Sequence, residues 1–100
     1  HRLVAMKERH ERARLFMYRA ALARATGSGV AMAASLAKIV GSDAVVGSSL
    51  DATTVHGALG YVTEYEVERA FRDAVGGRSY SGADDVLRNV VARLLGLPAS

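Results

Sequence analysis

The stretch VHGALGYVTEYEVERAFRDAVGGRSYSGADDVLRNVVAR, from Val55 to Arg93, decides how the rest of the chain is interpreted. It combines a glycine-broken turn, a charged segment, a second glycine-rich loop and an amphipathic segment. Its centre, Tyr80-Ser81-Gly82-Ala83, lies where a loop is expected to pass into a helix, because the acidic pair Asp84-Asp85 follows and a helix dipole favours such residues in its first turn. A helix start leaves backbone N–H groups free, so this junction could hold an anion or present a side chain to a reactive centre.

Two helical segments are predicted within this stretch. Thr63 and Glu66 have the spacing of a capping box, which predicts a short helix over Glu64 to Ala74 that ends before Gly76-Gly77. Apolar residues then recur at helical spacing up to Gly96 and Pro98, which are expected to close a C-terminal helix; these residues are Val86, Leu87, Val90, Val91, Leu94 and Leu95.

Two long helices are predicted upstream. Arg2 to about Ala25 contains no Gly or Pro, and its broad apolar surface favours burial against more than one helix. Gly27 is expected to end this helix and Ser28 to cap the next, which runs from Val30 to about Val55 and is rich in small residues. No strand pattern is visible. The sequence therefore predicts an all-α fold, an up-and-down helical bundle of two long helices, a short helical segment and a C-terminal helix.

Composition limits the classes of protein to consider. Half of the 100 residues are hydrophobic, which fits one small globular domain. The chain has no cysteine and no close histidine pair, so neither a disulfide framework nor a metal site is predicted. We see no run of about eighteen apolar residues and no signal peptide, so no membrane association and a cytoplasmic location are expected. The first 26 residues carry seven basic and two acidic residues, which leaves nucleic-acid binding as an alternative to the more common solvated helix face.

The Val55–Arg93 stretch resembles the C-terminal end of the acyl-CoA dehydrogenase family. The family pattern is approximately Q-I-H-G-G-x-G-Y-x-x-E-Y-P-V-E-R-x-x-R-D-A, followed after a short spacer by Y-E-G-T-x-E/Q-I-Q-R. The matching residues are Val55-His56-Gly57, Gly60-Tyr61, Glu64-Tyr65, Val67-Glu68-Arg69, Arg72-Asp73-Ala74, Tyr80, Gly82 and Arg88. Upstream, Ala34-Ser35-Leu36-Ala37-Lys38 resembles the A-S-M-A-K of the family's preceding helix, so the resemblance covers nearly the whole chain.

The resemblance implies a fold and an activity. Residues 1–100 would form one C-terminal helical domain, as the last three helical elements of the family's four-helix bundle, without the family's upstream domains. The family's chemistry is α,β-desaturation of acyl-CoA thioesters with FAD as electron acceptor. The resemblance therefore implies FAD in the full-length protein, an acyl-CoA substrate and an electron-transfer partner engaged through the missing domains, and a homo- or hetero-oligomer built through the bundle. The isolated chain is expected neither to retain FAD nor to be active.

The resemblance also implies site residues. Ser81 occupies the position where many members carry the glutamate of Y-E-G-T, the base that removes the α-proton. A serine hydroxyl without a neighbouring base cannot take that role, so no catalytic residue is assigned. The positions implied to bind the cofactor are Gly57, Ala58, Gly60, Gly82, Ala83 and Asp85.

Three hypotheses follow. In the first, the chain belongs to an active flavoenzyme whose base lies on a helix upstream of His1. In the second, it belongs to a catalytically silent subunit of a heteromeric complex, since Thr54, Ala58 and Ala83 also depart from the family pattern. In the third, it is a basic helical module that binds nucleic acid, which is disfavoured because the first helix lacks a recognition motif.

Overall fold

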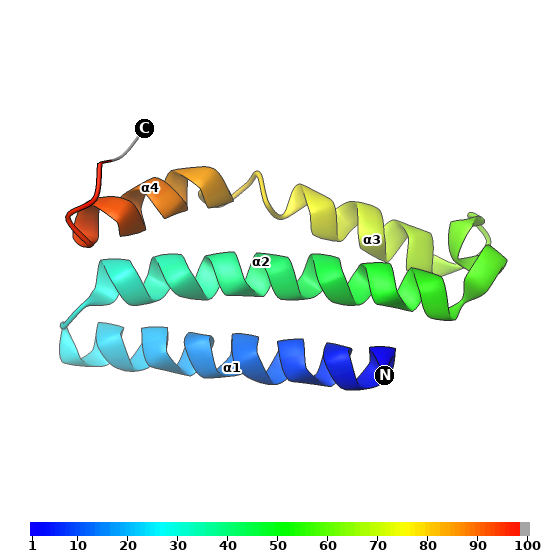
Figure 1. Ribbon diagram of the computed structural model, residues 1–100, viewed down its shortest axis with the longest axis horizontal. Helices are drawn as coiled ribbons and strands as arrows, with labels where there is room; N and C mark the ends of the chain where they lie inside the picture. The colour runs from blue at the N-terminus through cyan, green and yellow to red at the C-terminus, as the bar shows by residue number, and fades with distance from the viewer. Residues whose placement is uncertain (99–100) are drawn as a thin grey trace.

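The computed structural model describes residues 1–98 and is a three-layer arrangement of helices around α2. The elements are α1 (Arg2–Thr26), α2 (Val30–Val55), the 3-10 helix η1 (Gly57–Tyr61), α3 (Glu66–Gly76) and α4 (Asp84–Leu94). α1 runs antiparallel along one side of α2, and α3 and α4 follow one another end to end along the other side (Figure 1). No strand occurs in residues 1–98, so the all-α bundle is confirmed.

The turn between α1 and α2 is made by two glycines. Gly27 ends α1 in the left-handed region at φ 72°, and its N–H donates to the Ala23 carbonyl at 2.8 Å, as predicted. The prediction that Ser28 caps α2 is wrong. Gly29 occupies the N-cap at φ 65° with no side-chain cap bond, because a second left-handed glycine turns the chain directly into the helix.

Small residues and ion pairs join α1 to α2. A Cβ added at Gly47 would lie 2.9 Å from Nε of Arg9, so the glycine makes room for that side chain. Arg9 and Arg2 donate to opposite oxygens of Asp51 at 2.6 and 2.9 Å. The hydrogen bond from Arg9, reinforced by the one from Arg2, holds the pKa of the Asp51 carboxyl below its ordinary value.

α1 contacts no element of residues 1–98 other than α2. The prediction of more than one partner helix is therefore not met within the described chain, because α3 and α4 lie on the opposite side of α2. The outer surface of α1 keeps large apolar side chains exposed, among them Leu15 at 66% and Leu22 at 65%.

α2 is long and apolar enough, by length and composition, to cross a membrane, contrary to the expectation that no run of about eighteen apolar residues occurs. In the fold it is the middle layer, flanked by α1 on one side and by α3 and α4 on the other. Ala33, Ser35 and Ile39 of α2 are buried. Core helices of water-soluble proteins with this composition are mostly buried, whereas 11% of the most apolar 18-residue window of α2 is buried within residues 1–98, so its central position accounts for only part of its composition.

The segment before α3 departs from the predicted capping box. Tyr65, in extended backbone, is the N-cap residue, and no side chain caps the helix. α3 therefore begins at Glu66 rather than Glu64, and it continues to Gly76 rather than ending at Ala74. The physical reason is that the chain leaves η1 through the extended residue Val62 and closes a turn by a hydrogen bond from the Tyr65 N–H to the Val62 carbonyl at 3.4 Å. α4 ends at Leu94, close to the predicted end, and Gly96 follows at φ 78°.

Candidate functional site

The loop between α3 and α4, residues 77–83, lies over the middle of α2 and is called the junction loop below (Figure 1). Its turn is made by two consecutive residues in the left-handed region, Ser81 at φ 56° and Gly82 at φ 89°. Ser81 is the one residue other than glycine in residues 1–98 with a positive φ. That conformation is uncommon for a residue with a Cβ, so the junction loop holds Ser81 in a strained state.

Ser81 has no base beside it. Its side chain is exposed, and no carboxylate or imidazole of residues 1–98 hydrogen-bonds to its hydroxyl. His56 and Asp73 do not activate Ser81, because His56 Nδ1 lies 2.8 Å from the Ala52 carbonyl and Asp73 pairs with Arg69.

Lys38 of α2 joins the two ends of the junction loop. Its Nζ donates to the Gly77 carbonyl at 2.7 Å and to Asp84 Oδ1 at 2.8 Å. Asp84, the first residue of α4, is 4% exposed, and its Oδ2 is buried without a hydrogen-bond partner in residues 1–98. The Asp84 N–H donates to the Arg78 carbonyl at 3.0 Å, which closes the loop on itself.

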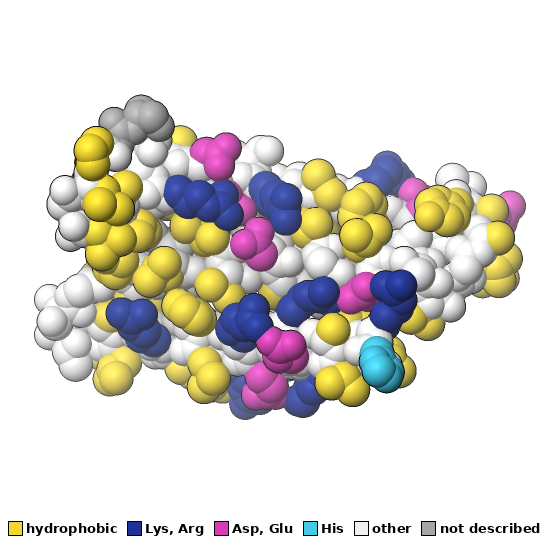
Figure 2. Space-filling view, viewed as in Figure 1, with side chains coloured by type: hydrophobic (Ala, Val, Ile, Leu, Met, Phe, Trp, Pro, Cys, Tyr) yellow, Lys and Arg dark blue, Asp and Glu magenta, His cyan; other side chains and the backbone are white. Residues whose placement is uncertain are grey.

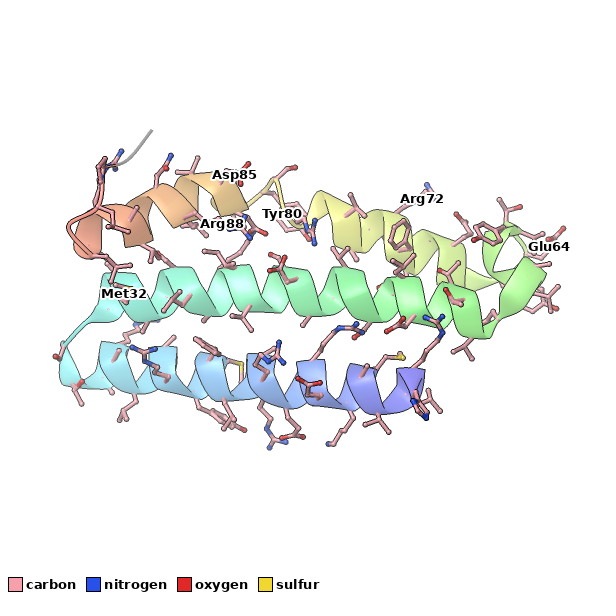
Figure 3. The ribbon with its side chains drawn as sticks, viewed as in Figure 1. Met32, Glu64, Arg72, Tyr80, Asp85 and Arg88 are labelled. Carbon is pink, nitrogen blue, oxygen red and sulfur yellow. The ribbon has the colours of Figure 1, made fainter. Side chains whose placement is uncertain are left out.

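A second, more exposed group of ion pairs lies beside the Lys38–Asp84 pair. Asp43 of α2 accepts a hydrogen bond from Arg78 at 3.2 Å and lies 3.8 Å from an Nη of Arg88. Arg88 reaches from α4 toward α2, whereas Asp85 points away from α2, although Arg88 also bonds to Asp85 at 3.2 Å (Figure 3). Side chains of both charges gather here on the surface (Figure 2). They surround a cavity of about 320 Å³ lined by Asp43, Arg78, Ser79, Ala83, Asp84, Asp85 and Arg88.

The first three predicted cofactor residues, Gly57, Ala58 and Gly60, lie in η1, beyond the C-terminal end of α2. Gly57 has φ 63° and, like Ala58, is exposed. Gly60 is buried, and a Cβ there would lie 2.4 Å from the Thr53 carbonyl oxygen. Gly60 thus has a structural role, since only a residue without a Cβ lets η1 approach α2 this closely.

The predicted residues fall into two groups. The structure brings Gly82, Ala83 and Asp85 together with Ser81 at the junction loop, where Ala83 is the N-cap of α4. The η1 group is separated from them by the length of α3 (Figure 1). Sequence reasoning missed the residues that tie the junction loop to α2. Lys38 could have been found, because it ends the A-S-M-A-K-like segment, but Asp43 carries no local signal.

The basic character of α1 is partly neutralised within the fold. Arg2 and Arg9 pair with Asp51, Lys7 pairs with Glu11, and Arg12 pairs with Glu8. These pairs favour the solvated helix face over a nucleic-acid surface, and the absence of nucleic-acid binding stays a prediction.

Comparison with known proteins gives a consistent set of matches. The model of the acyl-CoA dehydrogenase C-terminal domain matches residues 1–96. An acyl-CoA dehydrogenase of Bacillus subtilis (strain 168) is 37% identical over 94% of this chain and 25% of its own length. The L-prolyl-[peptidyl-carrier protein] dehydrogenase of Pseudomonas fluorescens is 33% identical over 97% of this chain and 26% of its own length.

Solved structures agree with the sequence matches. The crystal structure of the prolyl acyl carrier protein oxidase AnaB is 41% identical with a TM-score of 0.90, over 96% of this chain and 25% of that one. The FAD complex of PigA is 31% identical with a TM-score of 0.89 over the same shares, 96% and 25%. The chain therefore spans about a quarter of the length of these relatives.

Proposed function

Because this chain belongs to the acyl-CoA dehydrogenase family, as its C-terminal domain, we propose that the full-length protein is an FAD-dependent oxidoreductase that desaturates acyl-CoA thioesters at the α,β bond. The observation that carries the proposal is the family match over residues 1–96, together with the retained glycine and tyrosine positions of the junction loop and η1. Two relatives described above, one solved with FAD and one named an acyl-CoA dehydrogenase, support the cofactor and the substrate class.

The junction loop is compatible with a cofactor or substrate close to its backbone. The N–H groups of Ser81, Gly82 and Ala83 donate to no carbonyl of residues 1–98, so they are available to an oxygen atom of a bound group. Gly82 adds no side chain at the turn. When bound, FAD would accept the hydride from the β-carbon of the thioester, and this chain's part would be to present that backbone next to it.

We propose that the α-proton goes to a carboxylate outside residues 1–98. Ser81 lacks a partner that could activate it. Asp84 is buried and paired with Lys38, and Asp85 points away from α2 and pairs with Arg88. We therefore place the base upstream of His1, on a part of the full-length protein that packs against the junction loop.

The alternative is a catalytically silent subunit that completes a heteromeric complex with an active partner. It is supported by the loss of the family's glutamate, glycine and threonine at Ser81, Ala58 and Ala83. The two functions differ in whether this protein's own site turns over.

Purification of the full-length protein tests the proposal. We expect a yellow protein with a flavin absorbance spectrum that converts an acyl-CoA to a product two hydrogens lighter, as read by mass spectrometry. A folded but colourless protein that acquires no flavin on reconstitution would contradict the proposal and leave the silent subunit.

Ser81→Glu separates the two functions further. If the base is upstream, a second carboxylate at residue 81 is not needed, and the variant should turn over no faster than the parent protein. A flavin-loaded parent that is inactive, with desaturation gained in Ser81→Glu, would instead support the silent subunit whose base has been lost.

We also propose that the full-length protein is an oligomer and passes electrons to a separate carrier. The exposed apolar side chains along α1, Leu15, Tyr18 and Leu22, support a further packing partner for that helix. Sedimentation of the full-length protein would test the oligomer, and a monomer at micromolar concentration would contradict it.

A further inference from the structure

The junction loop is poorly determined by its own backbone. The N–H groups of Gly77, Arg78 and Ser79 at its start donate to carbonyls of the last turn of α3, and the N–H of Asp84 just after its end donates to the Arg78 carbonyl. Between them, Tyr80 to Ala83 donate to no carbonyl of residues 1–98, and the turn requires a left-handed serine. Gly76, the last residue of α3, and Gly77, the first residue of the loop, widen the range of backbone conformations open to the chain. Something outside the loop must therefore select the observed conformation.

We propose that Lys38 of α2 is the positioning residue that fixes the junction loop. Its one ammonium group holds the Gly77 carbonyl at 2.7 Å and the Asp84 carboxylate at 2.8 Å; Gly77 is the first residue of the loop, and Asp84 directly follows its last. The distance between those ends sets how far the chain must turn at Ser81 and Gly82. By this proposal, Lys38 determines which backbone atoms are presented at the proposed active site, without itself touching substrate or FAD.

The surroundings of Lys38 make this tie stronger than a surface ion pair. The Lys38 side chain is 23% exposed and that of Asp84 is 6% exposed, so water screens the pair weakly. Asp84 Oδ2 has no hydrogen-bond partner in residues 1–98. Lys38 is therefore the cation on which this buried carboxylate depends, together with the N-terminal end of α4.

The neighbouring ion pairs of Asp43 supply a matched control. Asp43 lies on the same helix and contacts both sides of the same loop, through Arg78 and Arg88. Its side chain and those of both arginines are about half exposed, at 48% to 51%. The Lys38 and Asp43 interactions thus lie at the same loop but differ in two respects: the Lys38–Asp84 pair is buried, and Lys38 also bonds to the Gly77 carbonyl.

Hydrogen exchange of the full-length protein tests the inference without depending on flavin or activity. Lys38→Met leaves a buried carboxylate without its cation, so the decisive variant is Lys38→Met with Asp84→Asn, which removes that charge as well. We expect the double variant to recover the thermal stability of the parent, while the amides of Arg78, Ser79 and Asp84 exchange about tenfold faster or more. Asp43→Asn should change the same amides by less than about threefold.

Three outcomes would overturn the inference. The first is unchanged exchange of the loop amides in the folded double variant. The second is faster exchange spread equally over α1 and α2, which would mean general destabilisation. The third is a double variant that does not fold, which would make the pair a requirement of the whole domain.

The catalytic consequence rests on the proposed function and is read separately. In the flavin-loaded double variant, the rate of flavin reduction at saturating acyl-CoA should fall more than tenfold while KM changes little. The reason is that the loop is proposed to position groups for the chemical step rather than to bind acyl-CoA. A full-length protein without flavin would remove the proposed function and leave the exchange result standing. A flavin-loaded protein with mobile loop amides and an unchanged rate would remove only the positioning role.

Discussion

Two features meet at Ser81. It stands where the family resemblance places the base, and it adopts a left-handed backbone conformation that a glycine would adopt more easily. Because its side chain is exposed and has no base beside it, the residue contributes a backbone shape rather than a reactive group. At the residue scale, we therefore expect residue 81 to act through its backbone conformation.

Substitution at this position should report conformation alone. Ser81→Val places a β-branched residue at φ 56° and should destabilise the protein by about 1–2 kcal/mol relative to Ser81→Gly, which accepts that φ without strain. Urea denaturation of the two variants measures the difference. Equal stability of the two variants would show that residue 81 does not hold a left-handed conformation in solution.

Gly60 is a second residue where backbone proximity decides the outcome. Gly60→Ala would place a Cβ 2.4 Å from the Thr53 carbonyl oxygen, so η1 must move off α2, at a cost of about 2–3 kcal/mol. Gly41→Ala is the matched control, since a Cβ there meets nothing within 4 Å and alanine favours the helix by about 1 kcal/mol. Thermal denaturation should lower Tm for the first variant and not for the second. A Gly60→Ala protein as stable as the parent would contradict the packing of η1.

At the element scale, α2 organises the molecule. It meets α1 through Asp51, the junction loop through Lys38 and Asp43, and η1 through Thr53. Its small residues let neighbours approach, and its charged residues bond to both sides, Asp51 to α1 and Lys38 and Asp43 to the junction loop and α4. Through these contacts, a helix that is apolar enough to cross a membrane lies at the centre of a helical domain.

The α1–α2 ion pairs predict a pH dependence. Arg9 and Arg2 lower the pKa of Asp51, so its ionised form stabilises the fold above about pH 3.9, the ordinary pKa of an aspartate. This contribution is lost as the pH falls through the lowered pKa. The stability difference between the parent and Asp51→Asn should therefore be full at neutral pH and shrink in acid.

Denaturation across pH 2 to 7, with Arg9→Met as the partner variant, measures this effect (the range brackets the carboxyl titration). The coupling between the two substitutions should disappear in acid together with the difference. A stability difference that is constant over the whole range would mean that the ionised carboxyl is not its source.

At the scale of the whole molecule, the sequence predicted the helices, which depend on neighbouring residues, and missed the contacts between residues far apart in the chain. The two long helices follow from an uninterrupted run and from Gly27, and their bounds are correct within one residue. The predicted caps at Ser28 and Thr63 are wrong, because α2 and α3 begin at backbone turns without a side-chain cap bond. The Lys38–Asp84 pair joins residues 46 apart, and only the packing of α3 and α4 on α2 brings them together.

A further prediction concerns residues 1–100 as an isolated chain. Residues 1–100 expressed alone should retain no flavin and show no dehydrogenase activity, because the matched relative is about four times as long and we place the base outside these residues. A flavin spectrum and an acyl-CoA turnover assay of the purified chain test this. Turnover of any acyl-CoA by these residues alone would refute it.

The central claim is that the full-length protein desaturates acyl-CoA with a base other than residue 81. The most direct measurement is anaerobic rapid mixing of acyl-CoA with the flavin-loaded full-length protein and with its Ser81→Ala variant, following flavin absorbance. We predict that the flavin is reduced in both proteins, at rates within about threefold of each other. No reduction in the parent protein, or a rate at least about a hundredfold lower in Ser81→Ala, would contradict the account.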